Sequence, residues 1–166
     1  TVSTEAVMDI VKSGTCGENL TWTLDSQGVL TISGTGKMED YTSNGGPWYS
    51  SSDSIKSVVI KKGVTTIGKH AFIYCASLEN ITIPEGVTSI GRSAFESCTR
   101  LKEITIPEGV TSIGTCAFYY CIEMKEIALP QSLLSIGDQA FYNVPGPSSI
   151  DLPEGLTTIG YYAFTS

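Results

Sequence analysis

The chain has 166 residues, of which 41% are hydrophobic and only 16% are charged, so it can bury a core and is not a disordered tail. Its net charge is −7 and its ten Lys and Arg residues form no basic run, which excludes a nucleic-acid partner and gives no attraction to anionic lipid. No apolar stretch approaches the ~20 residues that a transmembrane helix needs, so we expect no membrane insertion in this segment.

The first element in chain order is an N-terminal segment, residues 1–54, that we expect to carry a β-hairpin. Leucine and tryptophan alternate with threonine at 20–24, and the alternation resumes at 30–32 after a turn that contains glycine. We expect this hairpin to cap the first coil of the array that follows, by covering an open sheet edge. Before it, residues 5–12 could form a short helix, and after it we expect a loop at 45–52.

A 23-residue repeat occupies residues 55–166, and its last copy is incomplete. Isoleucine or leucine recurs in one phase, an Ile-Gly pair in a second and an Ala-Phe pair in a third. Several residue types held in phase over five copies indicate a solenoid, in which each unit buries its apolar face only against its neighbours. The three series are Ile60, Ile83, Ile106, Leu129 and Leu152; Gly68, Gly91, Gly114, Gly137 and Gly160; and Phe72, Phe95, Phe118, Phe141 and Phe164.

One unit, residues 78–98, indicates how a coil is built. Two isoleucines alternate with polar residues before Pro84, which predicts a short half-buried strand that ends in a turn. A second extended segment follows, and the spacing of Ala94, Phe95 and Cys98 predicts a single turn of helix with one buried face. Stacked at ~4.8 Å, the strands would form a parallel sheet and the phenylalanines a buried column.

The unit I-T-I-P-E-G-V-T-S-I-G-x-x-A-F-x-x-C, present at 81–98 and 104–121, resembles the BspA-like class of bacterial leucine-rich repeats. The segment before residue 55 is similar to the region that often precedes such arrays. The resemblance implies a leucine-rich-repeat solenoid, with right-handed coils of strand and short helix, a parallel sheet and an N-terminal β-hairpin cap. It also implies a secreted or cell-surface bacterial protein that adheres to host proteins or other cells and carries no catalytic residues.

The fourth and fifth units depart from the pattern. Ser132 replaces a glycine, and residues 143–147 have valine and proline where cysteine and leucine are expected, which predicts a locally distorted loop. The fifth unit stops just after Phe164, and a solenoid that ends there has no polar cap. We therefore expect either further chain or a second copy over the open end, the latter giving end-to-end self-association.

No residue pattern predicts an enzyme, a metal site or a cofactor. Cys75, Cys98 and Cys121 lie one coil apart, and we expect buried free thiols that act as small hydrophobes, because parallel Cβ vectors suit a disulfide poorly. No Cys/His spacing typical of zinc occurs. His70, the only histidine, occupies a variable slot at a surface corner, so we expect it to be solvated rather than paired with a cysteine.

Two outward surfaces are candidates for binding. The first is aromatic, and tyrosine is frequent at interfaces, although these rings could instead cover the turn beneath them. The second is the outward face of the first predicted sheet, because solenoids often bind on such a repeated concave face. Its mild chemistry favours weak or avidity-based binding. The aromatic candidates are Tyr74, Tyr119, Tyr120 and Tyr142, and the sheet candidates are Thr82, Glu103, Thr105, Glu126 and Asp151.

The sequence favours a non-catalytic, secreted or cell-surface module for binding or adhesion, with a host or bacterial surface protein or glycan as its partner. The alternative is a structural spacer or display scaffold within a larger surface protein. An enzyme would require a pocket with convergent polar groups. The chain begins at Thr1 with no visible secretory signal, so we expect a mature or trimmed product.

Overall fold

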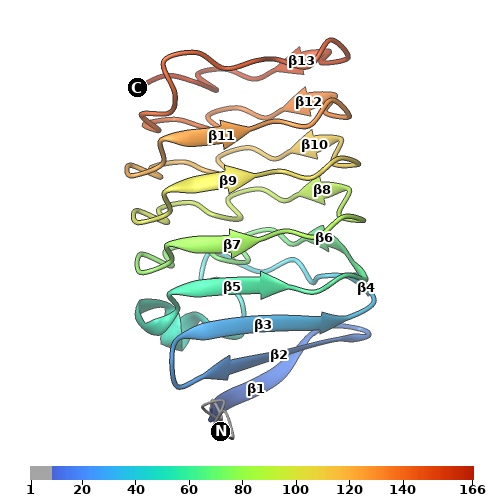
Figure 1. Cartoon of the computed structure of the whole chain (residues 1–166), viewed down its shortest axis with the longest axis vertical. Helices are drawn as coiled ribbons and strands as arrows, with labels where there is room; N and C mark the ends of the chain where they lie inside the picture. Colours follow the sequence, from blue (N-terminus) through green and yellow to red (C-terminus); the bar gives the residue numbers. More distant parts are fainter. Residues whose placement is uncertain (1–8) are drawn as a thin grey trace, which may run out of the picture.

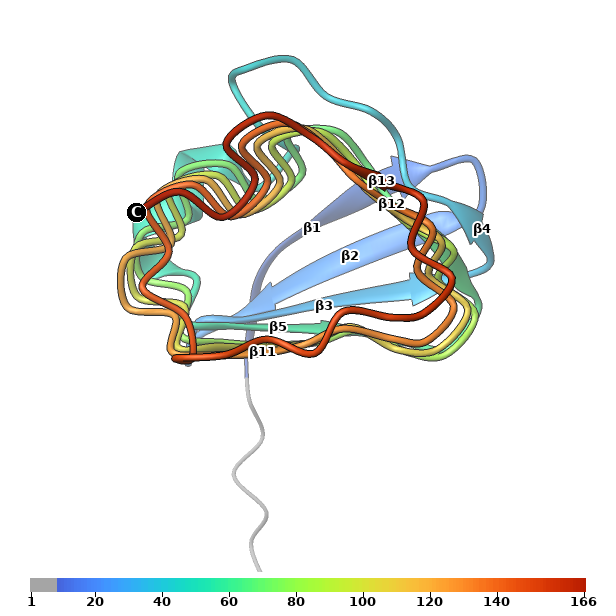
Figure 2. The same cartoon turned by 90° about the horizontal axis from the view of Figure 1, so that it is seen from above.

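The computed structural model describes residues 9–166 and shows a solenoid whose coils stack along the long axis of the molecule (Figure 1). Seen along that axis, each coil is a loop around a common interior, with strands on two of its sides (Figure 2). Strands of successive coils pair in parallel with a register of one repeat, as at Ile90 and Ile113. The predicted solenoid with parallel sheets is therefore confirmed.

The longer strands lie on one side, which we call the front sheet. It begins as a five-stranded sheet in the order β1-β2-β3-β5-β7, and it continues as a separate two-stranded sheet of β9 and β11. The hydrogen-bonded ladder is therefore interrupted between β7 and β9. The bounds are β1 Ile10–Gly17, β2 Leu20–Asp25, β3 Val29–Gly34, β5 Ser57–Ile60, β7 Asn80–Thr82, β9 Glu103–Thr105 and β11 Glu126–Ala128.

The shorter strands form a second, continuous sheet, which we call the back sheet. Its six strands follow the order β13-β12-β10-β8-β6-β4, so every coil contributes one strand to an unbroken ladder. The bounds are β4 Gly36–Lys37, β6 Val64–Ile67, β8 Ser89–Ile90, β10 Ser112–Ile113, β12 Ser135–Ile136 and β13 Thr158–Ile159.

The predicted hairpin is confirmed as β2 and β3, which pair antiparallel from Leu20–Gly34 to Leu24–Leu30. β3 pairs in parallel with β5, so the hairpin covers the edge of the first repeat strand as expected. The short helix expected at 5–12 is wrong for the residues that the structure describes. Residues from Ile10 onward form β1, an edge strand paired with β2, while residues 5–8 lie outside the described part of the chain. Pairing with a neighbouring strand overrides the weak local helical pattern.

The core is organised around the predicted phenylalanine column, which the structure confirms. Successive rings stack with centroids 5.1–5.3 Å apart, from Phe72 to Phe164. Trp48 extends the column into the N-terminal segment, 5.3 Å from Phe72, and its indole N–H donates to the carbonyl of Ala71 at 2.8 Å. The backbone ladders also cross from cap to repeats through β3–β5 and β4–β6. That residues 1–54 and 55–166 are separate domains stays a prediction.

The helical turn predicted at the Ala-Phe segment is wrong. Within residues 9–166 the single helical element is a 3-10 helix, η1 (Tyr49–Ser54), and each Ala-Phe segment is a run of turns. Alternate N–H groups bond across coils, as Phe95 does to the carbonyl of Ala117 at 2.8 Å. An α-helix would use those groups internally. To alternate bonds within the coil and between coils, the backbone takes left-handed conformations in each coil, as at Ser93 (φ 52) and Ser97 (φ 59).

The Ile-Gly pair marks the closest approach between coils. The N–H of Gly114 donates to the carbonyl of Ile90 at 2.9 Å, and a Cβ on Gly114 would lie 2.6 Å from the backbone nitrogen of Arg92. Glycine is therefore required by space and not by its dihedral freedom. The distorted loop predicted at 143–147 is confirmed, because the chain there is irregular and forms no front strand over 147–151.

Candidate binding surfaces

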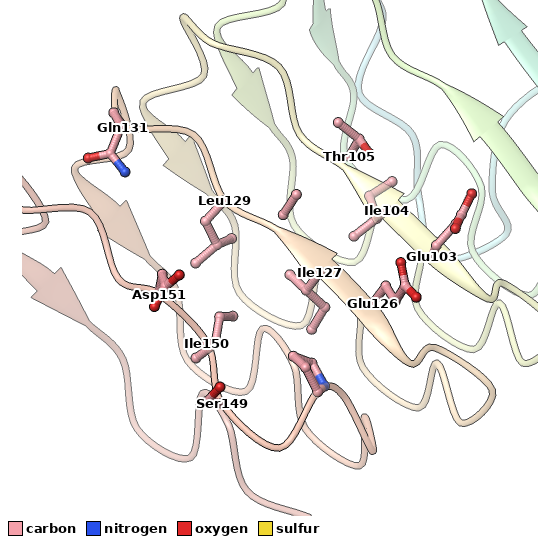
Figure 3. A pocket seen from close by; sticks show the side chains of 12 residues that line it. Glu103, Ile104, Thr105, Glu126, Ile127, Leu129, Gln131, Ser149, Ile150 and Asp151 are labelled. Carbon is pink, nitrogen blue, oxygen red and sulfur yellow. The ribbon is translucent and has the colours of Figure 1, made fainter.

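The sheet candidates all lie exposed along the front of the molecule. Thr82 is on β7, and the other candidates lie farther along the solenoid, on β9, on β11 and in the irregular segment that follows β11 in the fifth unit. The structure brings four of them, Glu103, Thr105, Glu126 and Asp151, to one groove of about 530 Å³ and leaves Thr82 outside it. Figure 3 shows Glu126 on β11 facing Asp151 and Ser149 across the hollow, with Glu103 and Thr105 on β9, the strand on the other side of β11. This volume lies in the range of natural ligand sites.

Sequence reasoning did not identify the floor of this groove. Ile127 and Ile150 are half-buried beside it, together with Leu129, whereas Val58 and Ile104 at the equivalent repeat position are buried. Gln131 and Pro147 complete its walls. Pro147 was the available signal, since it stands where leucine enters the core in earlier units, but the path of the loop it belongs to could not be read from the sequence.

The groove exists because the front ladder is interrupted a second time, after β11. In the preceding coil the N–H of Lys125 donates to the carbonyl of Lys102 at 2.9 Å. After β11 the chain makes one such bond, from Gly146 to Met124 at 3.0 Å, and residues 147–152 make no backbone hydrogen bond to β11 within the described chain. One edge of β11 therefore lacks a strand partner.

The two interruptions differ in charge. Between β7 and β9, Glu79 forms ion pairs with Arg100 at 2.6 Å and with Lys102 at 3.2 Å. The Lys102 hydrogen bond and the Arg100 charge hold the pKa of Glu79 below its ordinary value. After β11, the groove is lined by three carboxylates and by no Lys, Arg or His. None of these carboxylates forms an ion pair within residues 9–166.

Three of the four aromatic candidates form a second cluster on the turn side of the coils, whereas Tyr74 lies two repeats before Tyr120 and contacts no other tyrosine ring within residues 9–166. The rings of Tyr119 and Tyr142 stack at 5.1 Å with planes 9° apart, as expected from their shared slot. Tyr120 is tilted against Tyr119 at 5.0 Å, and both Tyr120 and Tyr74 are exposed. Partial burial among these rings raises the pKa of Tyr119. Because Tyr119 and Tyr142 each cover one face of the other, the cluster offers a ligand less open ring face than separate tyrosines would.

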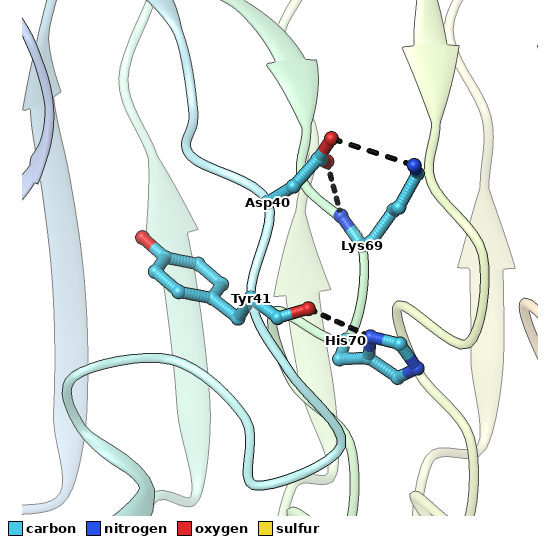
Figure 4. A network of polar contacts seen from close by, with 4 residues as sticks. All are labelled: Asp40, Tyr41, Lys69 and His70. Carbon is cyan, nitrogen blue, oxygen red and sulfur yellow. Dashed lines mark hydrogen bonds and ion pairs between the residues drawn. The ribbon is translucent and has the colours of Figure 1, made fainter.

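His70 takes part in a contact network that fastens the loop after β4 to the first coil (Figure 4). Its Nδ1 lies 2.9 Å from the carbonyl of Tyr41. Next to it, Asp40 accepts a hydrogen bond from the Lys69 backbone N–H at 2.8 Å, and its other oxygen lies 3.8 Å from Lys69 Nζ. His70 lies at a corner of the coil, with a backbone φ of 55, as predicted. Its side chain is half-buried, so the expectation of a fully solvated ring was wrong. This geometry gives His70 a role in fastening the loop.

The cysteines offer no activated nucleophile. The predicted burial of Cys75, Cys98 and Cys121 is confirmed, and all five cysteines are free thiols in this structure. Burial raises the pKa of Cys75 to about 12, and the Cys98 thiol donates to the carbonyl of Phe72 at 3.1 Å. Within residues 9–166, no three His, Cys, Asp or Glu side chains are arranged to hold a metal ion. No helix in that range is long and apolar enough to cross a membrane.

Comparison with known protein families identifies the repeat. Residues 46–166 match the BspA type leucine rich repeat region in six copies. The chain therefore belongs to the BspA-type leucine-rich repeat family, and the resemblance inferred from the repeat unit is confirmed. The match begins just before Trp48, the first ring of the aromatic column. No curated protein matches the chain.

Solved structures of bacterial leucine-rich repeat proteins share the fold. The T. pallidum leucine-rich repeat protein is 27% identical with a TM-score of 0.66, covering 91% of this chain and 66% of that one. A leucine-rich cell surface protein of Faecalibacterium prausnitzii is 26% identical with a TM-score of 0.54, covering 94% and 52%. A leucine-rich repeat protein of Eubacterium ventriosum, 23% identical with a TM-score of 0.55, covers 93% and 63%. The chain spans less than two thirds of the length of each.

Proposed function

We propose that this chain is a non-catalytic binding module, secreted or displayed at a cell surface, that holds a protein or glycan ligand in the front groove. The observation that carries the proposal is the convergence of Glu103, Thr105, Glu126 and Asp151 on one hollow with a partly apolar floor. Small numbers of polar groups around apolar side chains are the usual composition of a ligand site. Membership in a family that includes a cell surface protein supports the location.

The groove is a better candidate than the tyrosine cluster because it is concave and leaves polar groups without partners. The stacked tyrosines already satisfy one another's faces, and so bury less new area on binding. A catalytic reading lacks support, since the three carboxylates of the groove are all exposed and are not set in unlike environments, as paired acid and base catalysis requires.

The test is a pull-down from surface-protein extracts together with a glycan array, using matched variants. Ala128→Trp places a large side chain in the groove, and Thr82→Trp makes the same change at the equivalent position of β7, outside the groove. Both positions are exposed, so both variants should melt like the wild type. We expect a ligand retained by the wild type and by Thr82→Trp but lost with Ala128→Trp.

The double variant Tyr119→Ser, Tyr142→Ser addresses the aromatic surface. Binding lost in this variant and kept in Ala128→Trp would move the site to the tyrosines and contradict the groove proposal. If the wild type retained no protein or glycan at all, the module would be a structural spacer or display scaffold.

A further inference from the structure

We infer that the front groove takes an extended, cationic segment of a partner protein, laid against the free edge of β11. The inference rests on the proposed function and narrows its ligand from protein or glycan to a basic protein segment. Two independent features of the groove support it: an interrupted backbone ladder and an uncompensated set of carboxylates.

The first feature is the free edge. β11 pairs with β9 on one side through Glu126–Glu103, Ile127–Ile104 and Ala128–Thr105. On its other side, residues 147–152 run past without a backbone hydrogen bond to it, within the chain described. An exposed edge of this kind binds an extended segment through main-chain hydrogen bonds, while pockets beside it select alternate side chains.

The second feature is the charge of the walls. At the other interruption of the front ladder, the chain supplies its own cations, because Arg100 and Lys102 both pair with Glu79. At the groove, Glu103, Glu126 and Asp151 have no such partners among residues 9–166. Lys102 and Lys125 lie on the neighbouring hollow with Glu103 and Glu126 but make no ion pair with them. A segment with Lys or Arg at alternate positions would supply the missing cations.

The same features disfavour other occupants. The carboxylates are not grouped closely enough to hold a metal ion, since no set of three candidate ligands occurs in residues 9–166. An acidic glycan would meet three negative charges, and like charges brought together across an interface reduce affinity. The groove also has no aromatic side chain in its lining on which a sugar ring could stack.

The inference is tested by fluorescence anisotropy with a labelled synthetic peptide of alternating lysine and threonine. The comparison peptide has glutamate in place of lysine. A third peptide keeps the lysines but is N-methylated at every residue, which removes all of its backbone N–H donors. The groove variant is E103Q/E126Q/D151N. Its matched control, E18Q/E85Q/E154Q, removes three exposed carboxylates elsewhere and so has the same net charge as the groove variant.

We expect the lysine peptide to bind the wild type and the control, and to lose at least about tenfold in affinity for the groove variant. The glutamate peptide should not bind, and N-methylation should weaken binding. Equal losses in both variants would mean diffuse attraction to an acidic protein and would overturn the inference. An unaffected N-methylated peptide would overturn the pairing with β11.

The failure of this inference can be separated from failure of the proposed function. A glycan or neutral protein that is lost with Ala128→Trp, in the absence of lysine-peptide binding, would refute the cationic segment and keep the groove as a site. Absence of any ligand in the pull-down, the array and the peptide assay would refute both.

Discussion

At the scale of single residues, the phenylalanine column is the largest repeated contribution to the core. Phe118 is fully buried between Phe95 at 5.2 Å and Phe141 at 5.1 Å. We predict that Phe118→Ala lowers the free energy of unfolding by about 3–5 kcal/mol, because a close-packed interior leaves a cavity where the ring is removed. Urea titration followed by circular dichroism measures the loss.

Phe164 provides the internal control for that prediction. It occupies the same slot in the last coil, stacks on Phe141 alone and is 38% exposed. Phe164→Ala should therefore cost clearly less than Phe118→Ala. Equal costs for the two substitutions would mean that stacking between coils does not determine the contribution of each ring.

The cysteines allow a second prediction at this scale, since the thiolate is the reactive form. Burial raises the pKa of Cys16 and of Cys75 to about 12, and it also raises the pKa of Cys98 and Cys121. Cys116 has a raised pKa from partial burial but is the one cysteine of the five that is not buried.

We therefore predict that iodoacetamide at pH 8 labels Cys116 first in the native protein, and that the remaining four react only when the protein unfolds. Peptide mapping by mass spectrometry after a short exposure identifies the labelled site. Rapid native labelling of Cys98 or Cys121 would contradict the buried column.

At the scale of elements, Glu79 bridges the place where the front ladder is interrupted between β7 and β9. The hydrogen bond from Lys102 and the charge of Arg100 lower its folded-state pKa, while the unfolded chain has the ordinary value. A depressed carboxyl pKa contributes stability above the ordinary glutamate pKa, and that contribution is lost as the pH falls through the folded-state pKa.

Glu79→Gln should therefore lower Tm slightly at pH 7, and the difference from the wild type should shrink as the pH falls below about 4. Differential scanning calorimetry across this range, at low and high salt, checks it. The exposed Glu85→Gln, for which no ion pair exists within residues 9–166, serves as control. A Tm difference that stays constant down to acid pH would exclude the ion pairs as its cause.

The elements also mark where sequence reasoning succeeds. The repeat phase predicts the paired strands, because side chains held 23 residues apart must stack. It fails at the Ala-Phe segment, because one-turn spacing is shared by a helix and by turns whose N–H groups bond the next coil. It also misses Trp48, which has a different side chain and lies 24 residues before Phe72.

The candidate site shows the same division. The repeat slot predicts which side chains of the front sheet face outward, so Glu103, Glu126 and Asp151 could be named in advance. Glu103 and Glu126 lie side by side on paired strands, as the repeat requires, but their meeting with Asp151 depends on the path of residues 147–151, which is set by lost backbone pairing and not by any local pattern. Ser132 is a second feature that the repeat pattern does not explain. It replaces the glycine of the repeat, and its hydroxyl donates to the carbonyl of Val110 at 2.8 Å and accepts from the N–H of Gly109 at 2.9 Å.

At the scale of the whole molecule, the question is whether cap and repeats unfold together. Backbone pairing through β3–β5 and β4–β6 and the stacking of Trp48 on Phe72 couple them. In a solenoid, stability is approximately the sum of unit terms and nearest-neighbour interfaces, so a well-packed junction transmits unfolding. The tryptophans report on this junction, because Trp22 and Trp48 both lie in the N-terminal segment, 5.8 Å apart.

We predict that tryptophan fluorescence and far-ultraviolet circular dichroism give coincident urea transitions for the wild type, as a single cooperative unit requires. Phe141→Ala weakens an interface at the far end, so its dichroism transition should begin at lower urea than its fluorescence transition. Separate transitions already in the wild type would mean that residues 1–54 and 55–166 unfold independently. In that case the shared ladders would be too weak to join them, and ligand binding to the front groove would stabilise only the dichroism transition.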